Sequence, residues 1–484
     1  MKVMKIFVIS LLALCLGCGQ SFLDLPPQDQ SSVANFFRNG EDLNTAVNAA
    51  YGALKTTGQY NKALHAVGEL RSDNTEILDA QSGVDLVQLD LFTTQSNNPL
   101  VNAMWNDHYS GIQQCNMVID RAPGITMDES LKQRLVAEAK FLRALMYFNL
   151  VRSFGDVPLV IKEIKDFQEG YEYGRESLDR IYEQIVADLQ VAEVDLLVGY
   201  TGADVGRATI GAAKSLLGKV YLTRNQYSLA VSKLREVVNS EVYELLDNYA
   251  DLYKINNKNH SESVFEVQYK KGGIGQGSPF HNQFAPRNSG LIVSIVGQAH
   301  GYNIPTQDME DAYEEGDVRR DISMASGYMN DQEFVGLKHI TKYKDTPFQP
   351  DDADNNWPVL RYADVILMLA ECLNEEGFVA DGEAFSLLNN IRDRAGLELL
   401  SSNHSDANYR VSDQAQFRMA IAQERRVELA FENHRWFDLV RTGKALEVMN
   451  AKGFSITENQ LVLPIPLSQV QINSEKMKQN DDYQ

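Results

Sequence analysis

The segment ERRVELAFENHRWFDLVRTGK, residues 424–444, holds nine charged side chains and one histidine around a tryptophan and two phenylalanines. Glutamates, a histidine and arginines this close together could act as general acids, general bases or anion ligands. A general base that works near neutral pH needs burial or a like-charged neighbour, because either one raises its pKa. Whether these side chains are catalytic therefore depends on how the local structure pairs their charges.

The spacing of this segment predicts one continuous helix with an apolar face. Five residues fall near that face at helical spacing: Val427, Phe431, His434, Phe437 and Val440. Acids and bases recur at i,i+3 spacing, where helix side chains can pair, and the expected pairs are Arg425–Glu428, Glu432–Arg435, Arg435–Asp438 and Asp438–Arg441. Glu424 is left needing a tertiary partner. Paired carboxylates stay ionised and make poor bases, so the segment is predicted to be structural.

Other catalytic motifs are absent from the sequence. It has no GxSxG, HExxH or P-loop pattern. The stretch GGIGQGS ends on Ser278, where a dinucleotide-binding loop needs a glycine. The stretch PDDADNNW begins like a calcium loop but puts Trp357 where that loop needs a glycine. The eight histidines are scattered, so we expect no enzyme, no cofactor and no metal site.

Composition and charge narrow the functional classes. The chain has 484 residues, of which 44% are hydrophobic and 23% charged, as is ordinary for a globular protein. Its net charge is −21, whereas a nucleic-acid binder needs a basic face that displaces counterions. We therefore expect no nucleic-acid partner.

The first residues, 1–17, are predicted to be a signal peptide. Two lysines precede an apolar run over residues 6–16 that is too short to span a bilayer. A glycine then precedes Cys18, as in a bacterial lipobox, whose cysteine is lipidated and becomes the mature N-terminus. The alternative is a plain secretory signal cleaved nearby. Cys115 and Cys372 lie on apolar helical stretches and are expected to be buried thiols.

Helical periodicity covers about residues 43–259 and 357–445. Residues 207–240 are expected to form two antiparallel helices with a break at 223–226. Their small side chains, Gly218 among them, fall at the spacings with which tetratricopeptide repeats pack closely.

Between these helical regions, about residues 270–356 are rich in Gly, Pro, Asn and Asp and show few sustained periods. Long structured loops on a rigid scaffold are where binding sites usually lie. The expected fold is therefore all-α: a tetratricopeptide-like helical repeat scaffold, residues 18–484, with an inserted irregular, loop-rich ligand lobe.

Several sequence motifs, taken together, resemble those of a known family. The lipobox and SFLDLPP are followed by EAKFLRALMYFNLVRSFGDVPLV, VLRYADVILMLAE, IRDRAGL, the charged segment above and LVLPIP. In that order, and over nearly the whole chain, they resemble the SusD/RagB family of outer-membrane lipoproteins that capture nutrients. The resemblance implies a lipid-anchored protein at the cell surface and a SusC-like, TonB-dependent transporter over which it sits as a lid. Family members mostly bind glycans, and some serve peptide uptake.

The resemblance also implies where a ligand would bind: on the loop ELRSDNTEILDAQ and on the lobe. Sugars present apolar faces that stack on aromatic rings, together with hydroxyls that need hydrogen-bond partners. The three tryptophans fall in motifs that the family uses whatever its ligand, so the rings must come from loops. The candidates are Phe92, Phe280, Phe284 and Tyr302, with Tyr313 and Tyr328 also in the lobe, and Asp73, Asn74 and Gln81 for hydrogen bonds. Most of these rings are expected to be lobe core, and Tyr302 with Phe280 is the preferred platform, opposite Asp73 and Asn74.

Three functional classes remain open from the sequence. The first is a surface lipoprotein that captures an oligosaccharide and delivers it to the transporter, and it is the predicted one. The second is a peptide-binding member of the same family. The third is a glycoside hydrolase on a helical scaffold, which would need two carboxylates placed across a cleft.

Overall fold

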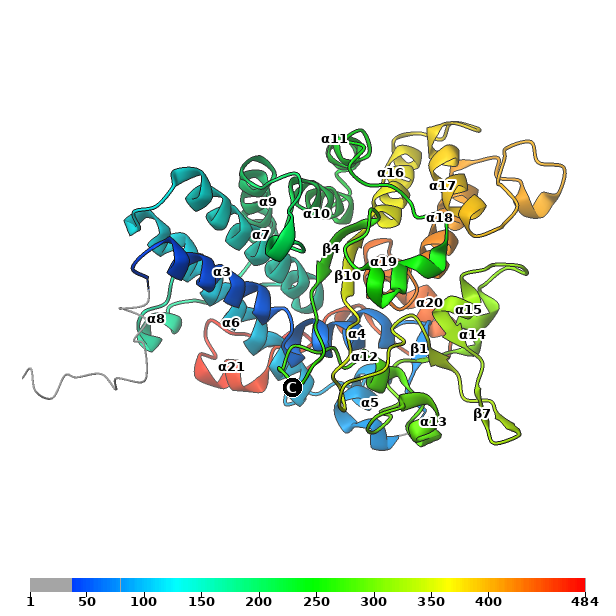
Figure 1. The fold of residues 1–484 in the computed structure, drawn as a ribbon, viewed down its shortest axis with the longest axis horizontal. Helices are drawn as coiled ribbons and strands as arrows, with labels where there is room; N and C mark the ends of the chain where they lie inside the picture. The colour runs from blue at the N-terminus through cyan, green and yellow to red at the C-terminus, as the bar shows by residue number, and fades with distance from the viewer. Residues whose placement is uncertain (1–36, 79, 484) are drawn as a thin grey trace, which may run out of the picture.

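The computed structural model describes residues 37–78 and 80–483 (Figure 1). The described chain is mostly helical with a few short strands, which confirms the expected fold class. The expected signal peptide and Cys18 lie outside the described residues.

A row of helices forms the scaffold and runs across the molecule in Figure 1. Each helix packs against the next in the order α3, α6, α7, α9, α10, α11 and α16, and α16 also packs against α17 and α18. The helices of the N-terminal half are α3 (Gly40–Ala53), α6 (Pro99–Arg121), α7 (Glu129–Phe154), α9 (Leu178–Asp195), α10 (Ile210–Thr223) and α11 (Tyr227–Val238). Those of the C-terminal half are α16 (Tyr362–Glu376), α17 (Glu383–Arg394), α18 (Gln414–Glu428), α19 (Arg435–Arg441), α20 (Ala445–Ala451) and α21 (Leu467–Ile472).

The pair α10 and α11 has the close packing that the sequence indicates. The break between them falls at residues 224–226, within the expected segment. A Cβ atom added at Gly218 would lie 2.6 Å from a methyl carbon of Leu234. Glycine therefore lets the two helices approach each other more closely than any larger residue would. Cys115 and Cys372 are buried free thiols in α6 and α16.

The lobe is built from short elements between the two groups of helices. They are β4 (Ser263–Val267), α12 (Phe280–Phe284), α13 (Leu291–Ser294), β5 (Ile304–Pro305), α14 (Gln307–Asp311), α15 (Arg320–Ser323), β6 (Met324–Ala325), β7 (Tyr328–Asn330), β8 (Glu333–Val335), β9 (His339–Ile340) and β10 (Trp357–Arg361). Shorter elements of the N-terminal half are α4 (Ala63–His65), β1 (Thr75–Glu76), α5 (Val84–Asp90), β2 (Val157–Pro158), α8 (Phe167–Gly170) and β3 (Arg175–Glu176).

Two strand pairs join the lobe to the rest of the chain. Antiparallel β4 and β10 lead out of the scaffold and back into α16. Antiparallel β1 and β5 bring the loop after the first helices against the lobe, with Thr75 opposite Pro305. One hydrophobic cluster runs through the scaffold and the lobe. The loop and the lobe, which the resemblance implied for the ligand, are therefore neighbours.

Candidate functional site

The charged segment 424–444 is not one helix, contrary to expectation. Helix α18 ends at Glu428, and α19 begins at Arg435. Between them Phe431 and Asn433 have φ angles of 66° and 68°, in the left-handed region that side chains other than glycine rarely adopt. Helical periodicity cannot reveal such a break, because the apolar residues on both sides still fall near the helical spacing.

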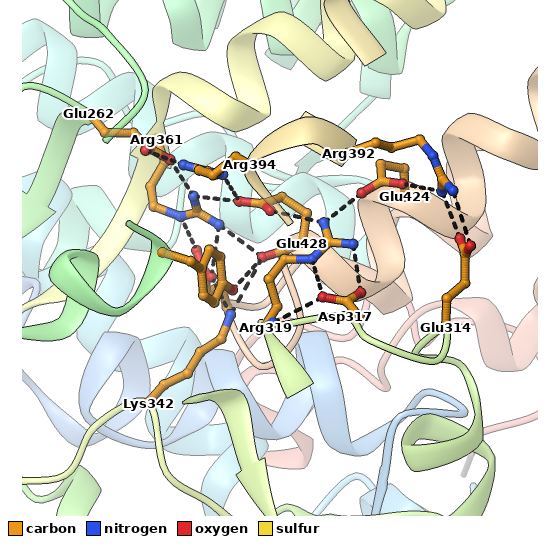
Figure 2. Close-up of polar contacts among 12 residues, drawn as sticks. Glu262, Glu314, Asp317, Arg319, Lys342, Arg361, Arg392, Arg394, Glu424 and Glu428 are labelled. Carbon is orange, nitrogen blue, oxygen red and sulfur yellow. Dashed lines mark hydrogen bonds and ion pairs between the residues drawn. The ribbon is translucent and has the colours of Figure 1, made fainter. Parts of the chain in front are cut away.

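The glutamates of this segment bind distant arginines instead of local ones, as Figure 2 shows. Glu428 accepts hydrogen bonds from Arg319 (3.1 Å), Arg361 (3.0 Å) and Arg394 (2.6 Å). Of the four expected local pairs, Asp438–Arg441 is confirmed, at 2.8 Å. The other three are wrong. The break in the helix separates Glu432 from Arg435, and in the other two pairs the side chains bind partners on other elements, such as Asp364 for Arg425 and Asp73 for Arg435.

The other two glutamates of the segment are also paired with tertiary partners. Glu424 does take tertiary partners, as expected, with Nη1 of Arg319 at 2.5 Å and Nη1 of Arg392 at 3.2 Å. Glu432 binds Lys342 at 2.8 Å and Arg361 at 2.7 Å.

Electrostatics keep these carboxylates ionised. Burial alone would raise the pKa of Glu432, but Arg361 and Lys342 outweigh it and lower the pKa to about 2. Burial likewise opposes ionisation of Glu428, and Arg394, Arg361 and Arg319 together hold its pKa well below the usual range. Burial lowers the pKa of His434 to about 3, with Lys219 adding to the effect. None of these groups is poised to exchange a proton near neutral pH. The network is therefore structural, and its ion pairs join the lobe to the scaffold.

Three of the candidate ligand-binding rings are core residues in the structure. Phe280 and Phe284 are 0% and 1% exposed and pack around Trp357, which stacks on Tyr343 at 4.8 Å. Phe92 is buried against Trp436 and Phe454. These three rings have no exposed face for a sugar, which corrects the expected platform. Most of the rings were expected to be core, but which of them are buried cannot be inferred from sequence in a region without periodicity.

The two candidate polar residues of the first loop are buried as well. The Asp73 carboxylate accepts two hydrogen bonds from Arg435, at 2.7 and 2.8 Å. Asn74 accepts from Nε of Arg426 at 2.9 Å and donates to Glu69 at 3.1 Å. In this structure both side chains therefore fix the loop to α18 and α19 and are not aimed outward.

Tyr302 is a candidate ring that reaches the surface, and it lies among polar groups. It is half-buried and stacks on His300, with ring centroids 5.4 Å apart and an interplanar angle of 29°. Nζ of Lys62 lies 4.8 Å from its centroid and 2.9 Å from a carboxylate oxygen of Asp85. Nε2 of His300 lies 3.1 Å from a carboxylate oxygen of Asp351.

Gln81 lies beside these residues. Gln81 is exposed, and its backbone oxygen accepts a hydrogen bond from Arg287 of the lobe at 2.6 Å. The next residue, Ser82, donates to the backbone oxygen of His300 at 3.1 Å. We call Lys62, Gln81, Asp85, His300, Tyr302 and Asp351 the Tyr302 face.

The backbone of the Tyr302 face is held in an unusual conformation. Gly301 and Asn303 both have positive φ angles, 70° and 48°. The Asn303 side chain donates from Nδ2 to Nδ1 of buried His65 at 2.8 Å. Nε2 of His65 lies 2.8 Å from Oε1 of Gln283, whose backbone oxygen accepts from the Tyr302 N–H at 2.8 Å. His65 thus holds the segment at two points, and burial lowers its pKa to about 3, so it stays neutral.

Sequence reasoning missed four members of the Tyr302 face: Lys62, Asp85, His300 and Asp351. They come from four separate segments, and no spacing in the sequence connects them. Phe348 was missed as well: it lies in the same turn as Asp351 and is 64% exposed. Its place between two prolines, in TPFQP, is a signal that could have marked it as an exposed turn residue.

The described part of the chain offers neither a cluster of metal ligands nor a membrane-spanning helix. Within residues 37–483, apart from Asp79, no three acidic, histidine or cysteine side chains are grouped so that they could hold a metal ion. In the same part of the chain no helix is both long and apolar enough to cross a membrane.

Known proteins resemble this chain over nearly its whole length. The SusD family profile matches residues 249–483, and a profile described as starch-binding associating with outer membrane matches residues 21–222. SusD-like protein P2 of Formosa agariphila is 29% identical over 512 aligned residues, which cover 100% of both chains.

Solved structures agree with these matches. A laminarin binding SusD-like protein superposes with a TM-score of 0.78 at 28% identity, over 92% of this chain and 100% of its own. Surface glycan-binding protein A from Bacteroides fluxus has a TM-score of 0.78 at 25% identity, over the same shares of the two chains. The profile matches and the similar chains and structures, which together span nearly the whole chain, lead to one assignment: the chain belongs to the SusD/RagB family, a family of non-catalytic binding proteins.

Proposed function

We propose that the protein captures an oligosaccharide at the cell surface through the Tyr302 face. The observation that carries the proposal is the stacked pair of Tyr302 and His300, bordered by two carboxylates and an ammonium group. Relatives whose names describe laminarin binding and surface glycan binding share the fold at 28% and 25% identity.

The chemistry of the Tyr302 face suits a sugar. Rings offer a flat surface to the C–H face of a pyranose, and desolvating it contributes to binding. Asp85 and Asp351 can accept hydrogen bonds from hydroxyls, Lys62 can donate, and Gln81 can do both. Because Lys62 already pairs with Asp85 at 2.9 Å, its ammonium group is not free to neutralise an anionic ligand. A neutral ligand therefore needs no counter-charge there.

Phe348 extends the surface available to a longer chain. Its exposed ring stands above Gly273, where an added Cβ would lie 3.1 Å from the ring. It precedes Asp351 by three residues in one turn. An oligosaccharide that stacks on Tyr302 can continue toward this second ring.

The same proposal includes an anchor and a partner. Cys18 follows an apolar run and a glycine, which supports lipidation there and attachment to the outer membrane. The match to a profile described as associating with outer membrane supports the same location. Membership of the family supports delivery of the ligand to a TonB-dependent, SusC-like transporter.

A panel of ligands tests the proposed function. Affinity gel electrophoresis with laminarin, soluble starch and, in a parallel pull-down, a peptide digest separates the two binding classes. We expect retardation by at least one neutral polysaccharide and no retention of peptides. Retention of peptides without retardation by any polysaccharide would favour the peptide-binding class instead.

A further inference from the structure

A hollow of about 230 Å³ opens beside β4 and shares no residue with the Tyr302 face. Its walls come from the loop before α10, the loop after α11 and β4 itself. Three exposed valines line it: Val198 (58% exposed), Val205 (42%) and Val242 (42%). A cavity needs only about 10–15 Å³ of such space to hold one water molecule, so the hollow has room for several waters or for one sugar ring.

The wall that carries Val205 is fixed by Arg207. Nη1 of Arg207 donates to Glu138 of α7 at 2.8 Å, and Nε donates to Asp204 at 2.7 Å. Nη2 reaches Asn44 and Asn48 of α3 at 2.9 and 2.7 Å. A preformed wall loses little conformational entropy when a ligand binds.

The opposite wall is fixed by Tyr243. Its hydroxyl lies 2.8 Å from Oγ1 of Thr209, and its ring stacks on Tyr362 with an interplanar angle of 25°. A Cβ atom added at Gly211 would lie 2.4 Å from the Tyr243 ring, so glycine is what allows this approach. The hydroxyl pair of Tyr243 and Thr209 keeps the capacity for further hydrogen bonds.

The charges of the hollow favour a neutral ligand. Four of the five N–H groups of the Arg207 guanidinium already donate hydrogen bonds, and its carboxylate partners Glu138 and Asp204 offset its charge, so it attracts a phosphate or sulfate only weakly. Glu266, which is 8% exposed, accepts from Asn356 at 2.8 Å with Oε2. Its other oxygen accepts no hydrogen bond from any described residue, which leaves an acceptor for ligand hydroxyls.

We propose that this hollow is a second binding site, for one neutral sugar unit. Glu266 and Tyr243 would bind its hydroxyls, and the three valines would cover its apolar face. The inference rests on the proposed function, because glycan capture is what makes a neutral sugar the expected ligand. A second site on the scaffold would let one protein hold a long glycan at two points, which raises the overall affinity through effective concentration.

Blocking variants test the second site. Laminarin and soluble starch are titrated calorimetrically against wild type, Tyr302→Ala, Val205→Trp and the double variant. Val242→Trp blocks the hollow from the other wall, in case Val205→Trp folds poorly. The matched control is Val379→Trp, at an exposed valine outside the hollow, and circular dichroism checks each fold.

We expect Tyr302→Ala to retain weak glycan binding. The double variant with Val205→Trp should bind the glycan more weakly still, by about tenfold or more. Val379→Trp, added to Tyr302→Ala in the same way, should leave the residual glycan affinity unchanged. If Tyr302→Ala alone abolishes binding, or if both blocking variants leave the remainder intact, the second site is overturned and the proposed function stands. If only the blocking variants matter, the second site stands and the role of Tyr302 is overturned. A wild type that binds neither polysaccharide overturns both.

Discussion

Nδ1 of buried His65 lies 2.8 Å from the side-chain nitrogen of Asn303, the residue that follows Tyr302. This hydrogen bond joins the first helices to the lobe at the point where the proposed sugar platform sits. Because Asn303 has a φ of 48°, its backbone is in a region that most side chains avoid. The buried hydrogen bond between His65 and Asn303 therefore helps to position the ring of Tyr302.

The first prediction concerns Asn303. Asn303→Ala removes the hydrogen bond and leaves a backbone conformation that costs about 1–2 kcal/mol for alanine. We expect glycan affinity to fall by about tenfold, whereas Asn303→Gly, which tolerates the positive φ, should lose less. Calorimetric titration of the three proteins measures this order.

A double-mutant cycle with Tyr302→Ala provides the control for that prediction. If Asn303 acts by positioning the ring, its substitution should have little further effect once the ring is gone. Equal losses of affinity in the presence and absence of the ring would mean that Asn303 does not act through Tyr302.

The second prediction concerns the buried ion network. Glu428→Ala leaves Arg319, Arg361 and Arg394 with an uncompensated buried charge, so we expect a loss of about 3–5 kcal/mol in the free energy of unfolding. Glu447→Ala is the matched control, because the Glu447–Lys444 pair is largely exposed and worth about 0–1 kcal/mol. Urea denaturation compares the two. Similar losses in both variants would show that burial does not set the strength of these pairs.

The third prediction separates core rings from surface rings. Phe280 is 0% exposed, so Phe280→Ala should lower the free energy of unfolding by about 3–5 kcal/mol. Tyr302→Ala should lower it much less, since its ring is only half-buried. Thermal unfolding of both variants checks this, and a reversed order would contradict the placement of the two rings.

The fourth prediction concerns pH. Burial, with Glu76 nearby, raises the pKa of Asp90 to about 7, against about 3.9 for an unperturbed aspartate. Between these values the folded protein keeps a proton that the unfolded chain releases. The stability that Asp90 contributes at low pH is therefore lost as the pH rises through 7.

Asp90→Asn should remove this dependence, because the amide can still accept from the Ile77 N–H and does not titrate. The difference in unfolding free energy between variant and wild type should shift by about 1–3 kcal/mol in favour of the variant from pH 5 to pH 8. Taking the difference cancels the other titrating groups. A constant difference across this range would show that Asp90 is ionised throughout.

The fifth prediction concerns the anchor. Several acyl chains hold a bacterial lipoprotein far more firmly than one chain would. In cells that lack the transporter, Cys18→Ala should move the protein from the membrane fraction to the soluble fraction. Continued membrane retention of the variant would argue against lipidation at Cys18.

The sequence predicted the scaffold better than the site, for physical reasons. Helical periodicity and the glycine at position 218 report directly on packing between neighbouring helices. The structure has helices in the expected regions and a close approach of α10 and α11 at Gly218. The ion pairs of Glu428 could not be predicted, because their partners lie 34 to 109 residues away. The same holds for Tyr302, whose neighbours Lys62 and Asp351 come from distant loops. Aromatic residue type alone did not separate a buried ring such as Phe280 from one that reaches the surface.

The most direct test of glycan capture through the Tyr302 face is calorimetric titration of the polysaccharide that binds best in the panel against wild type and Tyr302→Ala. The control is Tyr171→Ala, at a tyrosine that is 41% exposed on another part of the chain. Stacking on an aromatic ring contributes about 0.5–1.5 kcal/mol beyond burial. We therefore expect an affinity about tenfold weaker for Tyr302→Ala, with an unchanged circular dichroism spectrum, and an unchanged affinity for Tyr171→Ala. Equal affinities for wild type and Tyr302→Ala would contradict binding at the Tyr302 face.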